Sequence, residues 1–171
     1  MELLALLILS TIALLLYLGT RRKPFAPPAV SPITDRTLDA FEAAPSLWVN
    51  GAERGFFLVL LQSLPRGYHL HGKVRLEDII RVKRNVPEKA RWTLRGRVKS
   101  RHVDYLITDS TGRSVLAIEL DGAAHDPNNP SEADRVKTAL FAVTDIPLRR
   151  VRVGEDFHLI AATIATELNR S

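Results

Sequence analysis

The sequence predicts an α/β fold in which helices flank a mixed β-sheet, preceded by one N-terminal transmembrane helix. Between residues 51 and 169, segments with helix and strand signatures follow the order helix, strand, strand, strand, helix, strand, helix. The turn-forming sequence at residues 109–112 separates two of the strands and favours an antiparallel pair. A helix separates the last two strands and favours a parallel crossover between them. A mixed sheet satisfies both conditions.

The length and composition of the chain favour a globular domain without disulfides. A length of 171 residues is enough for one domain with a substantial core. The chain has no cysteine, which excludes disulfides and thiolate metal sites. Charged residues make up 25% of the chain, an ordinary fraction that favours a globular domain over a disordered chain.

The N-terminal segment is strongly apolar. Residues 3–18 are almost entirely Leu, Ile and Ala, and their number is close to the lower limit of about 17 for a helix that spans a bilayer. A cleaved signal peptide is the alternative, but such peptides begin with positive charge and end at small residues. Here Glu2 is the only charged side chain before the apolar run, and the basic triplet Arg21–Lys23 follows it.

We therefore expect an uncleaved, single-pass anchor at residues 1–20, which contacts the membrane through residues 3–19. Because basic residues follow the apolar segment, we expect the rest of the chain on the cytoplasmic side of the inner membrane. Residues 21–46 contain five prolines and predict a stiff, extended tether. The folded domain is then expected over residues 47–171.

The first helix and the first strand of the domain are predicted from capping, apolar spacing and alternation. Gly51–Leu64 has a broad apolar face, Asn50 is a suitable N-cap, and Pro65 follows the end of the helix. Tyr68–Val74 alternates well enough for a strand. The remaining segments are a short helix at Leu76–Val82, a loop at Lys83–Pro87, strands at Val103–Asp109 and Val115–Asp121, a helix at Ser131–Val143, a strand at Leu148–Val153 and a helix at Phe157–Asn169. The pattern of Trp92–Val98 favours neither helix nor strand.

Positive charge is concentrated in one segment. Residues 66–101 hold twelve Lys and Arg against three Asp and Glu, a local charge of +9, whereas residues 102–171 hold seven against eleven, a local charge of −4. This asymmetry predicts that the basic segment holds a polyanion on which the acidic segment acts. A solvated surface without a binding role is the alternative. The candidate nucleic-acid-binding residues are Lys83, Arg84, Arg91, Arg95 and Lys99.

Carboxylates lie at the ends of two neighbouring predicted strands. Asp104 stands near the start of one strand, and Glu119 and Asp121 stand near the end of the next. Because adjacent strands are about 4.8 Å apart, carboxylates on them can share one divalent cation, and oxygen-rich sites of this kind suit Mg²⁺ or Mn²⁺. Glu119 and Asp121 are two residues apart and therefore face the same side of the strand. Capping of the strand end is the alternative role for Asp121.

Several short motifs occur in order along residues 48–155. They are Ala52-Glu53, Val74-Arg75-Leu76, His102-Val103-Asp104-Tyr105, Ile118-Glu119-Leu120-Asp121, His125, Asp134-Arg135 with Lys137, and Pro147-Leu148-Arg149. This ordered set resembles the PD-(D/E)xK nuclease superfamily, whose restriction-endonuclease-like fold has an αβββαβ core. Within that superfamily, the motifs resemble the bacterial family known as domain of unknown function 2726. The string from Glu119 to His125 is also similar to very-short-patch-repair endonuclease relatives.

The resemblance implies a role for each matching residue. Asp104 corresponds to the metal-binding aspartate of the superfamily, and Glu119 corresponds to its second acidic ligand. Glu53 corresponds to a position on the first helix where some members place an acidic group near the metal. Mg²⁺ or Mn²⁺ would be held by Asp104 and Glu119, with Asp121 as a further candidate ligand.

One position departs from the superfamily pattern. The superfamily has a lysine two residues after the second acidic ligand, but Asp121 occupies that position here. Lys137 on the following helix and Lys99 before Asp104 are candidate replacements for this lysine. His125 is a further candidate, because a histidine can act as a general acid or base near neutral pH.

These expectations combine into one functional prediction with one alternative. The predicted protein is a membrane-anchored nuclease that uses Mg²⁺ or Mn²⁺ to hydrolyse phosphodiester bonds of nucleic acid, with DNA as the expected partner. The alternative is a catalytically inactive domain of the same fold, which binds nucleic acid, anionic lipid or a protein partner at the membrane.

Overall fold

The computed structural model of the chain describes residues 38–122 and 130–170. The predicted anchor at residues 1–20 lies outside the described residues, as do most of the predicted tether and His125. No helix among the described residues is long and apolar enough to cross a membrane. The anchor and the cytoplasmic orientation therefore stay predictions. Residues 44–171, which carry the predicted domain, form a unit separate from residues 1–43.

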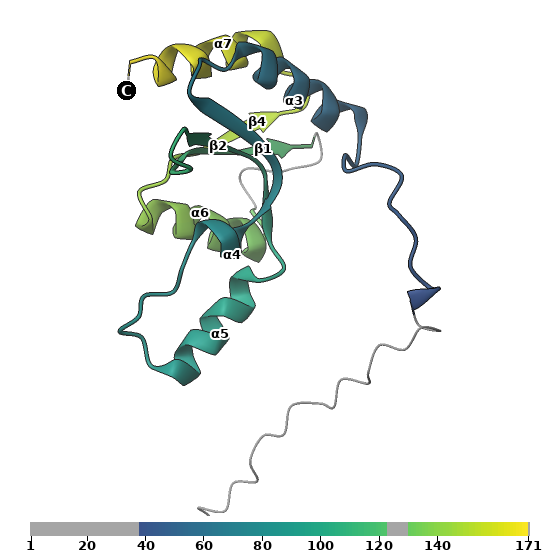
Figure 1. Cartoon of the computed structure of the whole chain (residues 1–171). Helices are drawn as coiled ribbons and strands as arrows, with labels where there is room; N and C mark the ends of the chain where they lie inside the picture. Colours follow the sequence, from purple (N-terminus) through teal and green to yellow (C-terminus); the bar gives the residue numbers. More distant parts are fainter. Residues whose placement is uncertain (1–37, 123–129, 171) are drawn as a thin grey trace, which may run out of the picture. The chain divides into compact units, whose positions relative to one another are not determined.

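A four-stranded mixed sheet lies at the centre of the domain (Figure 1). The strands follow the order β1-β2-β3-β4 across the sheet. They are β1 (Tyr68–Arg75), β2 (His102–Asp109), β3 (Ser114–Asp121) and β4 (Leu148–Arg152). The first three strands are antiparallel to their neighbours, whereas β3 and β4 are parallel. The predicted mixed sheet is therefore confirmed.

Helices cover both faces of the sheet. In Figure 1, α3 (Gly51–Ser63) and α7 (Phe157–Leu168) lie above the sheet, and α4 (Leu76–Ile79) and α6 (Glu132–Val143) lie below it. The remaining helix, α5 (Glu88–Val98), extends away from the sheet beyond α4. The domain thus has three layers, with α5 as an addition to the lower one.

Two hydrophobic clusters, one on each face of the sheet, hold these layers together. Tyr105 and Ile107 of β2 pack with Phe56 of α3 and Ile164 of α7, and all four side chains are fully buried. Leu106 lies between them in the sequence but packs in the second cluster, with residues of α4 and α6. Because successive residues of a strand point to opposite faces of a sheet, β2 contributes to both clusters.

Local sequence signals account for most element boundaries. The side chain of Asn50 accepts a hydrogen bond from the Glu53 N–H and caps α3, as predicted. The side chain of Ser131 caps α6 in the same way, by accepting from the Asp134 N–H. The observed ends of all four strands lie within one residue of the predicted ends.

The segment between β1 and β2 differs from the prediction. The short helix α4 ends at Ile79, three residues before its predicted end, because Ile80 has extended backbone and is buried in the core. Residues 92–98, whose pattern favoured neither state, belong to α5, which begins at Glu88. Most of α5 is exposed, and a helix without a wide buried face shows little apolar periodicity in its sequence.

Because Trp48 lies close to β1, we expect the stability of the domain to be sensitive to a larger side chain at Gly72. A Cβ atom added at Gly72 would lie 2.8 Å from Cη2 of Trp48, whose ring packs against the first hydrophobic cluster. We expect Gly72→Ala to lower the free energy of unfolding by about 1–3 kcal/mol, because the ring must shift. Urea denaturation of the isolated domain measures this change.

Gly55→Ala is the matched control for this prediction. Gly55 lies within α3, and an added Cβ would meet open space there. Alanine should therefore raise the free energy of unfolding by about 0.5–1 kcal/mol through helix propensity alone. A Gly72→Ala domain as stable as the wild type would contradict the packing of Trp48 on β1.

Candidate functional site

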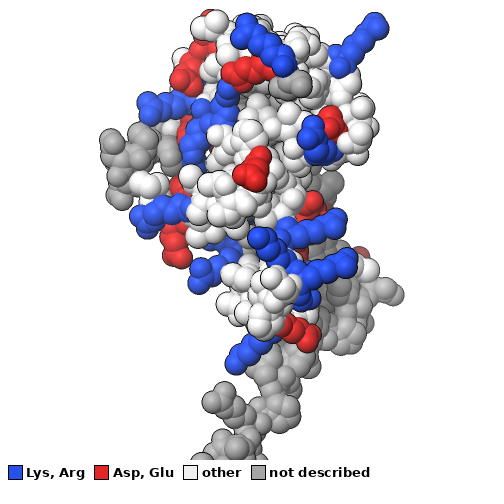
Figure 2. All heavy atoms as spheres, turned by 90° about the vertical axis from the view of Figure 1, so that its left-hand side faces the viewer, with Lys and Arg blue, Asp and Glu red and all other residues white. Residues whose placement is uncertain are grey.

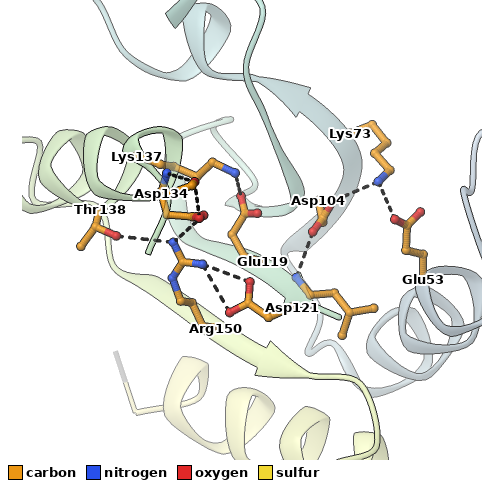
Figure 3. A network of polar contacts seen from close by, with 11 residues as sticks. Glu53, Lys73, Asp104, Glu119, Asp121, Asp134, Lys137, Thr138 and Arg150 are labelled. Carbon is orange, nitrogen blue, oxygen red and sulfur yellow. Dashed lines mark hydrogen bonds and ion pairs between the residues drawn. The ribbon is translucent and has the colours of Figure 1, made fainter. Parts of the chain in front are cut away.

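Four acidic side chains come together at one end of the sheet (Figure 3). We call them the carboxylate cluster, and its members are Glu53 of α3, Asp104 of β2, and Glu119 and Asp121 of β3. Lys73 of β1 lies between Glu53 and Asp104, whereas Lys137 of α6 pairs with Glu119 and Arg150 of β4 pairs with Asp121. The cluster therefore unites all the acidic residues that the sequence singled out, and each carboxylate has a basic partner.

Asp104 joins two neighbouring strands through its carboxylate. Its Oδ1 accepts a hydrogen bond from Nζ of Lys73 on β1 at 2.9 Å, and its Oδ2 accepts one from the N–H of Leu120 on β3 at 2.9 Å. The register of β2 and β3 places Tyr105 opposite Ile118, so Leu120 lies just past this pair. The Asp104 side chain thus acts in place of a backbone acceptor at the end of the ladder, and this contact fixes its orientation.

Lys73 links Asp104 to the first helix. Its Nζ donates to Oε1 of Glu53 at 2.9 Å, and Oε2 of Glu53 accepts from the N–H of Val49 at 2.9 Å. The side chain of Lys73 is 15% exposed, so this ion pair is largely shielded from water. Burial lowers the pKa of Lys73, but the hydrogen bonds to Asp104 and Glu53 outweigh this effect, and its pKa lies above the ordinary value. Lys73 is therefore a fixed positive charge between two carboxylates.

The backbone of Lys73 is unusual for a strand. Its φ angle is 53°, in the left-handed region that residues other than glycine rarely adopt. Such a conformation costs about 1 kcal/mol or more and persists where surrounding contacts determine it. Here the contacts are the two ion pairs with Glu53 and Asp104. The sequence around Lys73 does not predict this geometry, and Lys73 is therefore recognisable as a site residue only in the structure.

Glu119 has the most buried side chain of the carboxylate cluster, and its burial has a strong effect on its pKa. It is 7% exposed, and its Oε1 accepts from Nζ of Lys137 at 2.7 Å. Burial raises the pKa of Glu119 to about 7, the contact with Lys137 opposes this rise, and the negative charge of Asp104 adds to it. The negative charge of Asp104 thus contributes to the raised pKa of Glu119, as expected for carboxylates on adjacent strands.

Asp121 is held by an arginine of the neighbouring strand. Nη1 of Arg150 lies 3.0 Å from one carboxylate oxygen of Asp121 and 3.3 Å from the other. Nη2 of Arg150 lies 3.4 Å from Asp134 Oδ1 and 3.5 Å from Thr138 Oγ1, both on α6. Arg150 therefore ties β3 to α6 through Asp121, and a metal ion would have to compete with it for this carboxylate.

The site offers part of a coordination shell for a divalent ion. The described residues contain no group of three or more His, Cys, Asp or Glu side chains that could hold a metal ion. Asp104 and Glu119 nevertheless fit as two hard oxygen ligands, because Mg²⁺ commonly binds one or two carboxylates and takes its other ligands from water and substrate phosphate. A cation next to Glu119 would also favour the charged form of this buried carboxylate.

Lys137 and Lys99, the two candidate replacements for the superfamily lysine, differ in whether they contact the carboxylate cluster. Lys137 contacts Glu119 inside the site. Lys99 follows the last residue of α5, is exposed, and its side chain makes no hydrogen bond or ion pair with any described residue. The structure therefore brings Lys137 to the carboxylate cluster, together with Lys73, whereas Lys99 makes no contact with a described member of the cluster.

The five predicted nucleic-acid-binding residues form two groups: two make contacts within the domain, and three are exposed without a side-chain partner among the described residues. Arg95 pairs with Glu77 of α4, with its Nε at 2.8 Å from Oε1, and lies over the Trp92 ring. Nη2 of Arg91 donates to the backbone carbonyls of Arg84 and Val86 at 2.8 and 3.1 Å. These contacts hold α5 and the loop before it. The side chains of the other predicted residues, Lys83, Arg84 and Lys99, are exposed and have no side-chain partner in the described part of the chain.

The raised pKa of Glu119 predicts a dependence of stability on pH. Between pH 4.5, the ordinary pKa of a glutamate, and about pH 7, the folded domain keeps Glu119 protonated whereas the unfolded chain ionises it. Wild type should therefore lose stability relative to Glu119→Gln as the pH rises through this window, by on the order of 3 kcal/mol in total. Urea denaturation of both domains in EDTA, from pH 4 to pH 8, measures the difference. A wild type that gains stability relative to the variant over this range would show that Lys137 dominates instead.

Comparison with known proteins identifies the family of the chain. The sequence model described as a protein of unknown function (DUF2726) matches residues 47–167. This range includes every element from α3 to β4 and the whole carboxylate cluster. No curated protein and no solved structure matches the chain. Because the match spans more than half of the sequence, the chain belongs to the DUF2726 family.

Proposed function

We propose that the domain is a divalent-metal-dependent nuclease that hydrolyses phosphodiester bonds of nucleic acid. The observation that carries this proposal is the position of Asp104 and Glu119, two shielded carboxylates on adjacent strands with a lysine beside each. The order of elements and the mixed sheet support a restriction-endonuclease-like fold. The same features support the likeness to the PD-(D/E)xK superfamily, and the string from Glu119 to His125 supports the likeness to its repair endonucleases.

In this proposal, Asp104 and Glu119 hold one Mg²⁺ or Mn²⁺ ion. The ion would polarise the phosphate, activate the attacking water and stabilise the charge that develops at phosphorus. The contact between Asp104 and the Leu120 N–H supports this role, because it keeps one carboxylate in place before a metal binds. Asp121 and Glu53 would act around these ligands through Arg150 and Lys73.

The two lysines supply the positive charge that the superfamily takes from its motif lysine. An ammonium group has three N–H donors. Lys73 uses two of them, on Glu53 and Asp104, and Lys137 uses one on Glu119. Each lysine therefore retains a donor that can bind a phosphate oxygen or orient water. We assign this role first to Lys137, because it contacts the buried ligand Glu119.

The exposed part of the basic segment is the proposed contact surface for nucleic acid. Lys83, Arg84 and Lys99 can bind phosphates without breaking a contact within the domain. Arg91 and Arg95 contribute indirectly, because they hold α5 in place. With the predicted anchor, the domain would act on DNA at the cytoplasmic face of the inner membrane.

A second function has specific support. Lys73, Lys137 and Arg150 already balance the carboxylates, and no cluster of three metal-binding side chains occurs among the described residues. A domain that has lost catalysis and binds nucleic acid, anionic lipid or a protein partner would have these features. Metal binding separates the two functions, because only the first one requires it.

Substitution of Asp104 tests the metal site. Mn²⁺ at one hundred times its Kd should stabilise the wild-type domain by about 2.7 kcal/mol, since a ligand of the folded state shifts the unfolding equilibrium. Asp104→Asn should abolish this shift and any cleavage of DNA. Without metal, the variant should be less stable than the wild type by about 1–3 kcal/mol, because Lys73 loses a charged partner. Thermal unfolding with and without Mn²⁺ measures both effects.

Asp145→Asn is the matched control for Asp104→Asn. Asp145 lies on the exposed turn after α6 with a φ angle of 55°, which asparagine tolerates well. This variant should keep the metal shift and the cleavage of wild type. If the wild-type domain shows neither a Mn²⁺ shift nor cleavage of DNA or RNA, the nuclease proposal is wrong and the second function stands.

The exposed cations predict how nucleic-acid binding responds to salt. If about four phosphates are neutralised, the logarithm of the binding constant should fall against the logarithm of the salt concentration with a slope of about −3.5. Joint replacement of Lys83, Arg84 and Lys99 by Ala should flatten the slope to about −1. Arg170→Ala, at an exposed site near the C-terminus, is the control and should leave it near the wild-type value. An unchanged slope in the triple variant would place the contact surface elsewhere.

A further inference from the structure

A groove lies between α5 and α6, away from the carboxylate cluster. Its volume is about 500 Å³, within the range of pockets that bind small molecules. Leu94 of α5 forms one wall, Val136, Leu140 and Val143 of α6 form the other, and Val82 lies on the segment before α5. Figure 2 shows largely uncharged areas on the face of the domain that bears these helices, with an acidic side chain in one of them and Lys and Arg side chains beside them.

The groove lies beside the contacts that attach α5 to the domain. An ion pair with Glu77 and the buried side chain of Val98 attach this helix to α4 and the second hydrophobic cluster. Toward α6, apolar side chains remain in contact with solvent: Leu94 is 42% exposed and Val143 is 76% exposed. Exposure of this much aliphatic surface on both walls is unfavourable in water and would be relieved by an apolar occupant.

The charges along the groove have one sign. Arg81, Lys83 and Arg97 line it, and none of the described lining residues is Asp or Glu. The side chains of these three residues are exposed and make no ion pair or hydrogen bond with described residues. Charge complementarity therefore calls for an occupant with a negative group at the edge of an apolar body.

The side chains that line the groove favour an occupant whose apolar part is aliphatic. In the described part of the chain, every apolar lining residue is Val, Ile, Leu or Ala, and none of these offers an aromatic ring for stacking on a base. Among the described lining residues, Thr144 is the one neutral polar side chain, and its hydroxyl already contacts the carbonyls of Leu140 and Phe141. The groove thus offers no directional hydrogen bonds in its interior. We propose that it binds a single aliphatic chain that ends in an anionic group, a carboxylate or a phosphate.

A photoreactive probe tests this site on the full chain. The chain, reconstituted in phosphatidylcholine nanodiscs, is labelled with a dodecanoate that carries a diazirine, and the labelled residues are located by mass spectrometry. Labelling should concentrate on α5 and α6, and dodecanoate or dodecyl phosphate should compete it away. Neutral dodecanol and cationic dodecyltrimethylammonium should compete at least about fivefold less well, because the groove provides only positive charge.

Three variants distinguish binding in the groove from general partitioning of the probe into the membrane. Val143→Glu places a negative charge in the groove at an exposed position, where the fold should tolerate it, and should reduce labelling at least about tenfold. Leu159→Glu is the matched control, since Leu159 is 66% exposed on α7, outside the groove, and should leave labelling unchanged. Joint replacement of Arg81, Lys83 and Arg97 by Gln keeps the walls intact and should remove the preference for anionic competitors.

Three results would overturn the proposal. The first is labelling that is spread over the chain or equal in the two Glu variants. The second is competition by the neutral and cationic amphiphiles as strong as that by dodecanoate. The third is loss of the label only with an oligonucleotide or an acidic peptide, which would assign the groove to a macromolecule. The inference does not rest on the proposed nuclease function, because none of these measurements involves metal or cleavage.

Discussion

The Asp104 carboxylate is the contact on which the rest of the site depends. One of its oxygens binds the Lys73 ammonium and the other accepts the Leu120 N–H, so a single side chain connects β1, β2 and β3. Through Lys73 the connection continues to Glu53 and α3. Shielded charges of this kind are stable only when paired and hydrogen-bonded. The positions of the strands, the strained backbone of Lys73 and the orientation of the carboxylate cluster therefore support one another.

The fold was largely predictable because its signals are local. Caps at Asn50 and Ser131, turn residues between β2 and β3, and alternating apolar residues mark the elements directly in the sequence. The helix α5 was not predictable in this way, because most of its surface is exposed and its apolar periodicity is correspondingly weak. Tertiary contacts such as the Arg95–Glu77 pair hold this helix, and sequence patterns do not reveal such contacts.

The candidate site was predictable in its acidic residues and not in its basic ones. Asp104, Glu119 and Asp121 stand at strand ends, where the pairing of strands brings them together. Lys73 resembles any polar residue on a strand, and only the structure shows that it points to two carboxylates. This difference matters for function, because the lysines and Arg150 decide whether the carboxylates are available to a metal ion.

We propose that Asp104 and Glu119 together bind one divalent cation. A crystal of the domain grown with Mn²⁺, with diffraction recorded for the anomalous signal of manganese, tests this proposal. We expect one strong anomalous peak within coordination distance, about 2.0–2.2 Å, of both carboxylates, with water or phosphate as the remaining ligands. The proposal is wrong if no anomalous peak lies between the two carboxylates and both Lys137 and Lys73 keep their present contacts.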